Sequence, residues 1–536
     1  MKTKLLSFLF FVSFFQIGIS QNVSLDTSFG VDGKVVNSAI TSDQAIQLQS
    51  DGKIVCCYVS SFSLSGNVHL TRFNIDGSID NTFGNNGYVD TNLIFEGNTI
   101  NMMKIQSDDK IIITGFTSSN GTGNASYFNF QTLRLNSNGI IDSSFGVNGF
   151  ATLNLQPYDE SQIVEIQDDG KILIGGFSSL LNSTNSSADF AVVRYLSNGT
   201  LDTSFATNGV FIYNFGLHSI PFQGTNSSDY VKSIKVNSIG EIIVAGNATV
   251  NESVSNNDNF GFVCLNQNGI LNTSFGTNGQ KVIDFGDRDY LTNMKLTEFD
   301  EIIAVGQHSF YDNTVNNSEI AIVKLLNNGN FDSSFGSNGI VLTNRDANNN
   351  LDVLGDFEIQ ANGKLIGCGT SSGIEINGKD FLLIQFNADG TIDNTFNGNG
   401  YVLTDFNNTD DYGFSILMQN DGKIICAGLI YSIAGVLARY NLTNLSTSQF
   451  SKSQFSVSPN PFTTSINLTF SLPKNENLTI DLVDANGRVI QNLSKEKAFS
   501  SGNNSLLLDL PETLAKGIYF LKIYNGFENN TIKIIK

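Results

Sequence analysis

The stretch LDTSFGVDG, from Leu25 to Gly33, indicates a repeat fold because close copies of it recur along most of the chain. The copies read IDNTFGNNG, IDSSFGVNG, LDTSFATNG, LNTSFGTNG, FDSSFGSNG and IDNTFNGNG. Their shared phenylalanine recurs every 54 to 70 residues, at Phe29, Phe83, Phe145, Phe205, Phe275, Phe335 and Phe396. A period near sixty is too long for a helical solenoid repeat, so the chain is an array of larger units.

Two further phrases accompany each of these anchor phenylalanines. Segments such as AIQLQSDGKIVC, from Ala45, place a tight turn between two apolar runs, which indicates a hairpin. Runs such as HLTRFNIDG, from His69, add a third strand, and the short run after each anchor, such as KVV from Lys34, adds a fourth. Small sheets that are apolar on both faces must be covered by neighbours, so the pattern predicts an all-β chain with a seven-bladed β-propeller of four-stranded blades. We expect the N-terminal copy to complete the last blade and close the ring.

The anchor phrase has a structural explanation. Each anchor is followed four residues later by glycine, and the residue before that glycine is Asp or Asn, as in Asp32–Gly33. Asx–Gly pairs accept a positive φ and reverse the chain at little cost. Burial of one phenylalanine is worth about 1.5–3 kcal/mol. We therefore predict that the anchor phenylalanines are buried and stabilise the fold, and that the recurring aspartate of the phrase, such as Asp26, caps the turn.

The run RFNxDGxxDxxFGxNG followed by IQxDGKIxxxG resembles the delta-60 repeat family, whose members are expected to form β-propellers. The resemblance covers most of the chain before residue 441 and implies no defined enzymatic activity. The chain departs from the family pattern at Ala206 and Asn397, which replace glycine, at Asn272, which replaces aspartate, and at Cys264, which replaces arginine. These departures make the junctions that contain them less regular without changing the period.

The N-terminal segment is typical of a signal peptide. Lys2 and Lys4 precede an apolar run over Leu5–Ile19, and a small residue, Ser20, stands before Gln21. This pattern predicts a signal over residues 1–20 that is cut between Ser20 and Gln21. A membrane anchor is the alternative, but the run is shorter than the roughly 20 residues that a span needs. We expect no transmembrane segment in the mature chain.

The repeats stop after residue 441, and the composition then changes. We predict a propeller over residues 21–441, a polar linker over 442–454 (LTNLSTSQFSKSQ falls at this point) and a second domain over 455–536. Alternating runs in this last part, such as INLTFSL, LTIDLVD and IYFLKIY, predict a small C-terminal β-sandwich.

Three phrases of this second domain, SPNP from Ser458, DANGRVI from Asp484 and LAKGIYFLKI from Leu514, resemble the type A sorting domain of the bacterial type IX secretion system. The resemblance implies export by the Sec and type IX secretion machinery to the outside of the outer membrane, where the protein is secreted or held at the cell surface. An ordinary accessory sandwich is the alternative. The residues that carry the resemblance are Pro459, Asn460, Pro461, Asn486, Gly487, Gly517 and Tyr519.

Composition narrows the classes of partner. Hydrophobic residues make up 40% of the chain, which excludes wholesale disorder. The net charge of −20 argues against nucleic acid or an anionic membrane as a partner. The five cysteines are odd in number and lie in apolar runs, so we expect buried free thiols rather than disulfides.

The sequence contains no recognisable catalytic or metal-binding pattern. The three histidines, His69, His218 and His308, do not stand beside a nucleophile phrase, and no CxxC or HExxH spacing occurs. NIDGSID, from Asn74, resembles part of a calcium loop, but Arg72 and Phe83 occupy the first and twelfth ligand positions. We therefore predict a turn there, and we expect no catalytic residue, no metal and no cofactor.

These observations predict a non-catalytic binding or adhesion module. The connections that vary in length and sequence are placed on one face of the ring, and such loops are where ligand contact is expected. The expected ligand is a surface glycan or a surface protein. A glycan-active enzyme that uses a pair of loop carboxylates, or a purely structural surface protein, are the alternatives. The four most extended connections follow Phe177, Asn214, Gly246 and Leu342.

Overall fold

The computed structural model describes residues 21–40, 42, 44–59, 65–96, 101–118, 128–179, 188–216, 229–249, 258–312, 315–345, 352–372, 378–406, 409–444, 455–472, 475–484, 488–511, 513–524 and 529–536. Within these ranges every regular element is a β-strand. The chain divides into two compact units, with the division between Thr443 and Asn444. Each unit is described by itself.

The first unit consists of successive sets of four antiparallel strands. Set 1 is β3 (Gln44–Leu48), β4 (Ile54–Val59), β5 (Ser65–Phe73) and β6 (Tyr88–Glu96), and set 2 is β7 (Met103–Ile105), β8 (Ile111–Ser118), β9 (Phe128–Leu135) and β10 (Phe150–Leu153). Set 3 is β11 (Tyr158–Ile166), β12 (Ile172–Ser179), β13 (Ala188–Tyr195) and β14 (Val210–Tyr213), and set 4 is β15 (Tyr230–Val236), β16 (Ile242–Thr249), β17 (Asp258–Leu265) and β18 (Gln280–Ile283).

The remaining sets follow the same plan. Set 5 is β19 (Arg288–Leu296), β20 (Ile302–Asp312), β21 (Val315–Leu325) and β22 (Ile340–Thr343), and set 6 is β23 (Val353–Ile359), β24 (Leu365–Ser372), β25 (Lys379–Phe386) and β26 (Tyr401–Thr404). Set 7 combines β27 (Asp411–Met418), β28 (Ile424–Ile430) and β29 (Ala434–Asn444) with β2 (Lys34–Asn37) from the start of the chain.

The first strands of the sets contact one another in cyclic order, and β27 contacts β3 to complete the circle. The unit is therefore a β-propeller, as predicted. Single bridges between Ile94 and Phe116 and between Tyr158 and Phe128 join sets 1, 2 and 3 into one 12-stranded sheet. Because the pairing merges these three sets, the count of seven separate blades stays a prediction.

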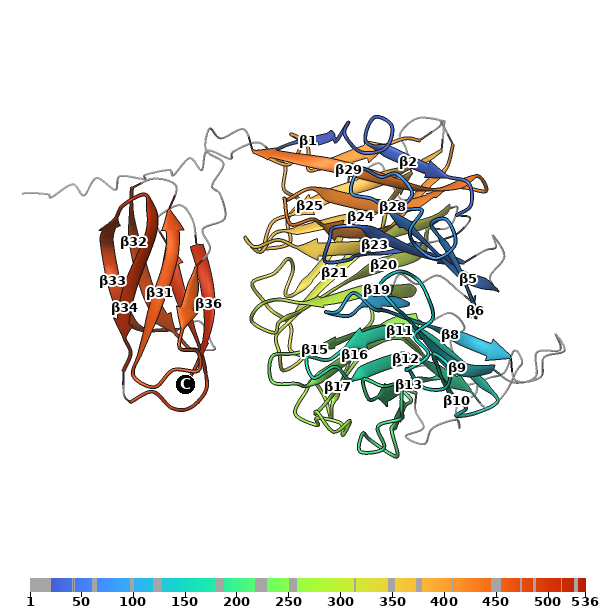
Figure 1. The fold of residues 1–536 in the computed structure, drawn as a ribbon, viewed down its shortest axis with the longest axis horizontal. Coiled ribbons are helices and arrows are strands. Elements are labelled where there is room, and N and C mark those ends of the chain that lie inside the picture. The colour runs from blue at the N-terminus through green and yellow to red at the C-terminus, as the bar shows by residue number, and fades with distance from the viewer. Residues whose placement is uncertain are drawn as a thin grey trace, which may run out of the picture. The chain divides into compact units, whose positions relative to one another are not determined.

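The N-terminal segment closes the ring. In Figure 1 the blue strands β1 (Gln21–Leu25) and β2 lie beside the orange β29. In β2, Lys34 pairs with Ala438 and Asn37 pairs with Gly435. The main chain of Gln21 also bonds to the anchor phrase of set 6, through Thr395 O and Asn397 N. The last set thus receives its fourth strand, β2, from the N-terminal part of the described chain.

The backbone at the anchor phrases agrees with the Asx–Gly prediction in six of the seven copies. Asp32, Asn86, Asn148, Asn208, Asn278 and Asn338 have φ values from 51° to 55°. In the seventh copy the positive φ belongs to Asn397, Gly398 and Gly400 instead of Asn399. The substitution of Asn397 for the usual glycine thus accompanies a different turn.

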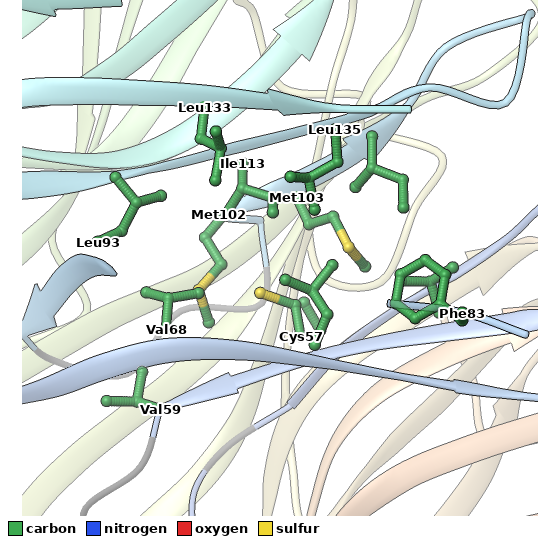
Figure 2. Close-up of a cluster of buried hydrophobic side chains, with 14 residues drawn as sticks. Cys57, Val59, Val68, Phe83, Leu93, Met102, Met103, Ile113, Leu133 and Leu135 are labelled. Atoms are coloured by element: carbon green, nitrogen blue, oxygen red, sulfur yellow. The ribbon is translucent and has the colours of Figure 1, made fainter. Parts of the chain in front are cut away.

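The apolar cores lie between neighbouring sets. Figure 2 shows one of them, in which Cys57 and Val68 of set 1 face Met103, Ile113 and Leu133 of set 2. Sheets that are apolar on both faces are buried in this way only when each is covered by the next. All five cysteines, which are Cys56, Cys57, Cys264, Cys368 and Cys426, are buried free thiols.

The second unit contains two sheets that enclose one core. One sheet has the order β30 (Ser456–Ser458), β31 (Ser465–Leu472), β34 (Gly502–Asp509), and the other has the order β33 (Val489–Phe499), β32 (Glu476–Val483), β35 (Ile518–Tyr524), β36 (Asn529–Ile535). Leu468 and Leu508 from the first sheet pack with Ile480 and Leu521 from the second. This is the β-sandwich that the alternating runs predict.

Candidate functional site

The strand connections of the ring fall on two faces. The turn face carries the connections from the first to the second strand of a set and from the third to the fourth. The loop face carries the connections from the second to the third strand and from the fourth strand to the next set. The four extended connections predicted as contact loops belong to the loop face, but their residues 180–187, 217–228, 250–257 and 346–351 lie outside the described ranges.

The turn face is built from a recurring cluster around each anchor phenylalanine. Arg194 donates from Nε to Asp202 Oδ2 at 2.8 Å, and its guanidinium lies 4.6 Å from the centre of the Phe205 ring. Its Nη1 donates to the main-chain oxygen of Gln267 in the next set. The same cluster recurs as Arg439–Asp26–Phe29, Arg72–Asp80–Phe83 and Arg134–Asp142–Phe145.

All seven anchors are buried, between 0% and 1% exposed. Because the clusters join neighbouring sets, they hold the ring together. Where the sequence departs from the pattern, the partners change: Lys324 replaces arginine beside Asp332, at 2.8 Å. At Cys264 and Asn272 the ion pair is absent from the described contacts, and Asn272 donates to Glu241 Oε1 at 2.8 Å.

The loop face has its own recurring residue, a buried aspartate at the start of the first strand in each of sets 3 to 7. These aspartates are all 0% exposed: Asp159, Asp229, Asp289, Asp352 and Asp411. Each accepts a hydrogen bond from a main-chain N–H of the preceding connection, for example Phe215 N to Asp229 at 3.0 Å and Phe406 N to Asp411 at 2.7 Å. The carboxylate therefore fixes the base of a loop-face connection.

In four of the five aspartates, Asp411 being the exception, the second oxygen is held by a donor from the paired strand. Ser178 donates to Asp159 Oδ1, Ser371 donates to Asp352 Oδ1, and His308 Nδ1 lies 2.7 Å from Asp289 Oδ1. These donors sit directly opposite the aspartate in the ladder. Burial raises the pKa of Asp159 to about 6.

Asp229 shows the same effect more strongly. Burial raises its pKa to about 8, although Phe215 N and Thr249 N both donate to it. A buried acid with a raised pKa is a candidate for acid–base chemistry. Here, however, the carboxyl oxygens are engaged by the backbone and the group is fully buried. The row of aspartates is thus a scaffold for the loop face.

The histidines are not brought together. His308 is buried, pairs with Asp289 and stacks on Phe310. His69 pairs with Asp90 and stacks on Tyr58. His218 lies outside the described residues. Each described histidine thus has an aspartate and an aromatic ring as partners, which is an arrangement that positions the imidazole.

The axis of the ring is crossed by buried polar side chains. Asn293 donates from Nδ2 to Asp356 Oδ1 at 2.7 Å, and its Oδ1 accepts from Asn101 Nδ2 at 3.1 Å and from Ser233 Oγ at 3.0 Å. These residues come from the innermost strands of sets 4, 5 and 6 and from the residues before β7. The network therefore ties distant sets across the centre.

Charged residues occupy the same strands nearer the turn face. Glu165 Oε2 lies 2.6 Å from Lys235 Nζ and 3.4 Å from Lys104 Nζ. Burial raises the pKa of Glu165, but the two lysines outweigh it and lower the pKa to about 2. Lys295 pairs with Glu358 at 2.8 Å. These mutual pairs are typical of structural ion pairs.

An exposed aromatic group lies on the loop face of set 7. Tyr431 and Ile433, in the connection between β28 and β29, are 60% and 47% exposed. The Tyr431 ring lies 5.9 Å from that of Tyr412, which stacks on Phe414 at 6.3 Å. Lys379 Nζ lies 4.7 Å from the centre of the Tyr412 ring. We call Tyr412, Phe414, Tyr431 and Ile433 the aromatic patch.

The segment from Asn74 forms a turn whose polar groups bond to one another. Asp76 Oδ1 accepts from the main-chain N and the hydroxyl of Ser78, at 3.0 and 2.6 Å. Asp80 accepts from Arg72 and Thr82. The hydrogen bonds of these carboxylates thus account for the acidic residues of this phrase.

The sorting-domain residues gather at the C-terminal strand of the second unit. Asn460 donates to Lys533 O at 3.1 Å and accepts from Ile535 N at 2.8 Å. Pro459 and Pro461 flank it on the surface. Gly517 and Lys536 exchange main-chain hydrogen bonds, and the buried Tyr519 donates to Ala515 O. Asn486, Gly487 and the predicted cleavage residue Ser20 lie outside the described ranges.

Comparison with known families identifies both units. The repeats match a family described as "Domain of unknown function (DUF5122) beta-propeller" over residues 49–83, 106–145, 167–205, 240–275, 301–335 and 360–396. Residues 456–536 match the secretion system C-terminal sorting domain. Six of the repeats are DUF5122 beta-propeller repeats. The sorting domain makes this DUF5122 propeller a secreted or cell-surface protein, and both resemblances found in the sequence are confirmed.

No curated protein matches the chain. Among solved structures, the DUF5122 propeller is similar to the polysaccharide lyase Uly1, with 13% identity and a TM-score of 0.45 over 76% of this chain and 91% of that one. It is also similar to a PL25 ulvan lyase bound to -[GlcA(1-4)Rha3S]-, with 12% identity and a TM-score of 0.45 over 77% and 95%. The Nup133 β-propeller domain of Vanderwaltozyma polyspora matches with 11% identity and a TM-score of 0.33 over 75% and 100%. At these identities and TM-scores, the similarity does not indicate an activity for this chain. Within the described ranges, no helix is long and apolar enough to cross a membrane.

Proposed function

We propose that this DUF5122 propeller is a non-catalytic binding or adhesion module that acts outside the cell, with the loop face as its contact surface. The observation that carries the proposal is that the repeated polar residues have different roles on the two faces. On the turn face the repeated polar residues join neighbouring sets. On the loop face a buried aspartate fixes the base of each connection that leads into sets 3 to 7. Variable loops on a rigid base are the usual arrangement for recognition.

The aromatic patch supplies a described part of that surface. Tyr and Phe rings offer large contact area with little loss of side-chain entropy, and they stack on sugar rings or on apolar protein side chains. Tyr431 is exposed at the edge of the patch, and Lys379 lies beside it to donate hydrogen bonds. A surface glycan or a surface protein is therefore the ligand class that we propose.

The experiment is an array of bacterial and algal glycans together with outer-surface proteins, probed with the full mature chain. We expect retention of a ligand without turnover, and Tyr431→Ala weakens that retention about tenfold or more, as aromatic contact residues do. The matched control is Val147→Ala, which removes an exposed apolar side chain from the turn face.

Other outcomes decide between the alternatives. Release of shortened or unsaturated products from a glycan would show a glycan-active enzyme and overturn the non-catalytic proposal. Equal losses in the two variants would remove the loop face as the contact surface. No retained ligand on any arm would favour a purely structural surface protein.

A further inference from the structure

Three aspartates meet on the loop face where set 6 borders set 7. Asp380 lies in β25, Asp405 directly follows β26, and Asp411 opens β27. One carboxylate oxygen from each lies within 4.8 Å of the others. Asp411 is fully buried, Asp380 is partly buried and Asp405 is exposed, so the cluster opens to solvent on one side.

Asp411 differs from the other buried aspartates of the loop face in its second oxygen. Asp159, Asp289 and Asp352 each receive a donor from the residue opposite them in the ladder. The residue opposite Asp411 is Ile430, which has no side-chain donor. Its Oδ2 accepts from Phe406 N, while Oδ1 is buried and has no hydrogen-bond partner among the described residues.

Asp405 differs from the residue at the matching position of set 3. Asn214 follows β14 as Asp405 follows β26, and the next residue, Phe215 or Phe406, caps the buried aspartate in both places. Asn214 donates from Nδ2 to Asp189 Oδ1 at 2.6 Å. With Asp405 in this position, the amide donor is replaced by a third carboxylate.

Two cations, Lys34 and Arg345, lie near the cluster, and Lys34 also acts on Asp411 by its charge. Lys34 Nζ donates to the main-chain oxygen of Asp405 at 2.6 Å and lies 5.0 Å from the centre of the Phe406 ring. Arg345 acts on Asp380 only through its charge, and its Nη2 donates to Ser372 O at 3.1 Å. The neighbouring Asp410 Oδ1 accepts from Lys379 N at 3.0 Å.

We propose that Asp380, Asp405 and Asp411 bind a divalent cation of the calcium class. Calcium takes carboxylate oxygens at about 2.3–2.6 Å, so two oxygens on one ion are at most about 5 Å apart. The separation in this cluster meets that limit. The open side leaves room for the water molecules that complete calcium coordination. The ion would take the place of the hydrogen-bond donor that the buried aspartate receives at the other junctions. That donor is a serine hydroxyl, a histidine ring or a main-chain amide.

The three carboxylates of the cluster carry like charges at close range. Like charges in one place repel one another, and a bound cation removes that cost. The ion would also fix the connection that leads into Tyr412 of the aromatic patch.

The test is calcium titration of the full mature chain, treated first with a chelator, by calorimetry and by thermal unfolding. We expect one site whose occupation raises the melting temperature of the propeller. Asp405→Asn restores the arrangement found at Asn214 and should weaken this site by about tenfold or more, since calcium affinity depends on the number of charged ligands. Because Asp405 is exposed, we expect this variant to fold, and its unfolding without calcium checks this.

The matched control is Asp284→Asn, which changes the residue at the equivalent place after β18. Asp284 is exposed and accepts from Gly286 N, and the buried Asp289 beside it has His308 as its second donor. This control should keep the wild-type affinity. Equal affinity in Asp405→Asn and the wild type, or no calcium-dependent heat and no melting shift in the wild type, would overturn the proposal. Neither result depends on the ligand-binding function proposed above.

Discussion

The residue directly after each anchor phenylalanine has a left-handed backbone in all seven copies. Five copies have glycine there, with φ between 52° and 57°, whereas Ala206 has φ 43° and Asn397 has φ 51°. Asparagine tolerates this region, but alanine is strained in it by about 1–2 kcal/mol. The repeat pattern marks these two positions as departures, and strain is expected at Ala206 but not at Asn397.

Ala206→Gly should therefore stabilise the propeller. We expect a gain of about 1 kcal/mol, which is the relief of strain less the greater entropy of glycine in the unfolded chain. Thermal unfolding of the mature chain measures it. The reciprocal variant Gly276→Ala should destabilise, because its Cβ would meet Gln280 O at 2.3 Å. A lower melting temperature for Ala206→Gly would show that the backbone there is not strained.

The ion pairs of the turn face make the free energy of unfolding of the propeller depend on pH. Burial raises the pKa of Asp332, but hydrogen bonds from Lys324 and Ser334 lower it to about 2, below the ordinary value of 3.8. Because the folded-state pKa is depressed, its contribution is present above pH 3.8 and is lost as the pH falls through about 2. Asp332→Asn should lose about 1 kcal/mol at neutral pH, after allowance for solvent screening, and show a flatter decline in acid. Urea unfolding from pH 6 to pH 2 checks this. An unchanged slope, or the same effect in the exposed Asp284→Asn, would contradict it.

For the strands and their connections, the sequence predicts the hairpins and the anchor phenylalanines. It does not predict which loop-face aspartates are buried or which donors they receive. The buried aspartates stand at a constant distance before the polar residue of the next turn, as in Asp229 before Asn237 and Asp411 before Gln419. That spacing is a usable signal. Their burial and their donors depend on cross-strand register, such as Ile430 opposite Asp411, and β-bulges in the first strands shift that register. The cluster of Asp380, Asp405 and Asp411 therefore follows only from the pairing of the strands.

Removal of Gln21–Asn37 tests the closing strand. The deletion takes away β2, Phe29 and Asp26, leaves Arg439 without its carboxylate and exposes the edge of β29. Breaking a buried ion pair costs about 3–5 kcal/mol, and an unpaired edge promotes aggregation. We expect a large fall in the melting temperature, together with oligomers in gel filtration. Removal of residues 21–23 alone, which keeps Asp26, is the control. A deletion that melted like this control would show that β2 does not close the ring.

At the scale of the molecule, two independent units have two different tasks. Recurrence of the anchor phrase predicts the propeller, and short motifs such as SPNP predict the sorting domain. The hydrogen bonds that cross the ring axis through Asn101 could not be predicted, because they join residues far apart in sequence that meet only when the sets close around the axis. The ligand likewise cannot be predicted from the repeated phrases, because the loops that differ between the copies share no sequence pattern.

Truncation after Asn444 tests the division of tasks. We expect the truncated chain to accumulate in the periplasm with a folded propeller, because the sorting domain is what directs transfer across the outer membrane. Fractionation and surface labelling of the producing bacterium measure the outcome against the full chain. Undiminished surface display of the truncated chain would contradict the assignment.

We propose that the ring closes with seven four-stranded blades and that β2 completes the last of them. A crystal structure of the chain from Gln21 onward would show both features. We predict seven blades, with β2 as the outer strand beside β29. A ring of six or eight blades, or an N-terminal segment that does not pair with β29, would contradict it.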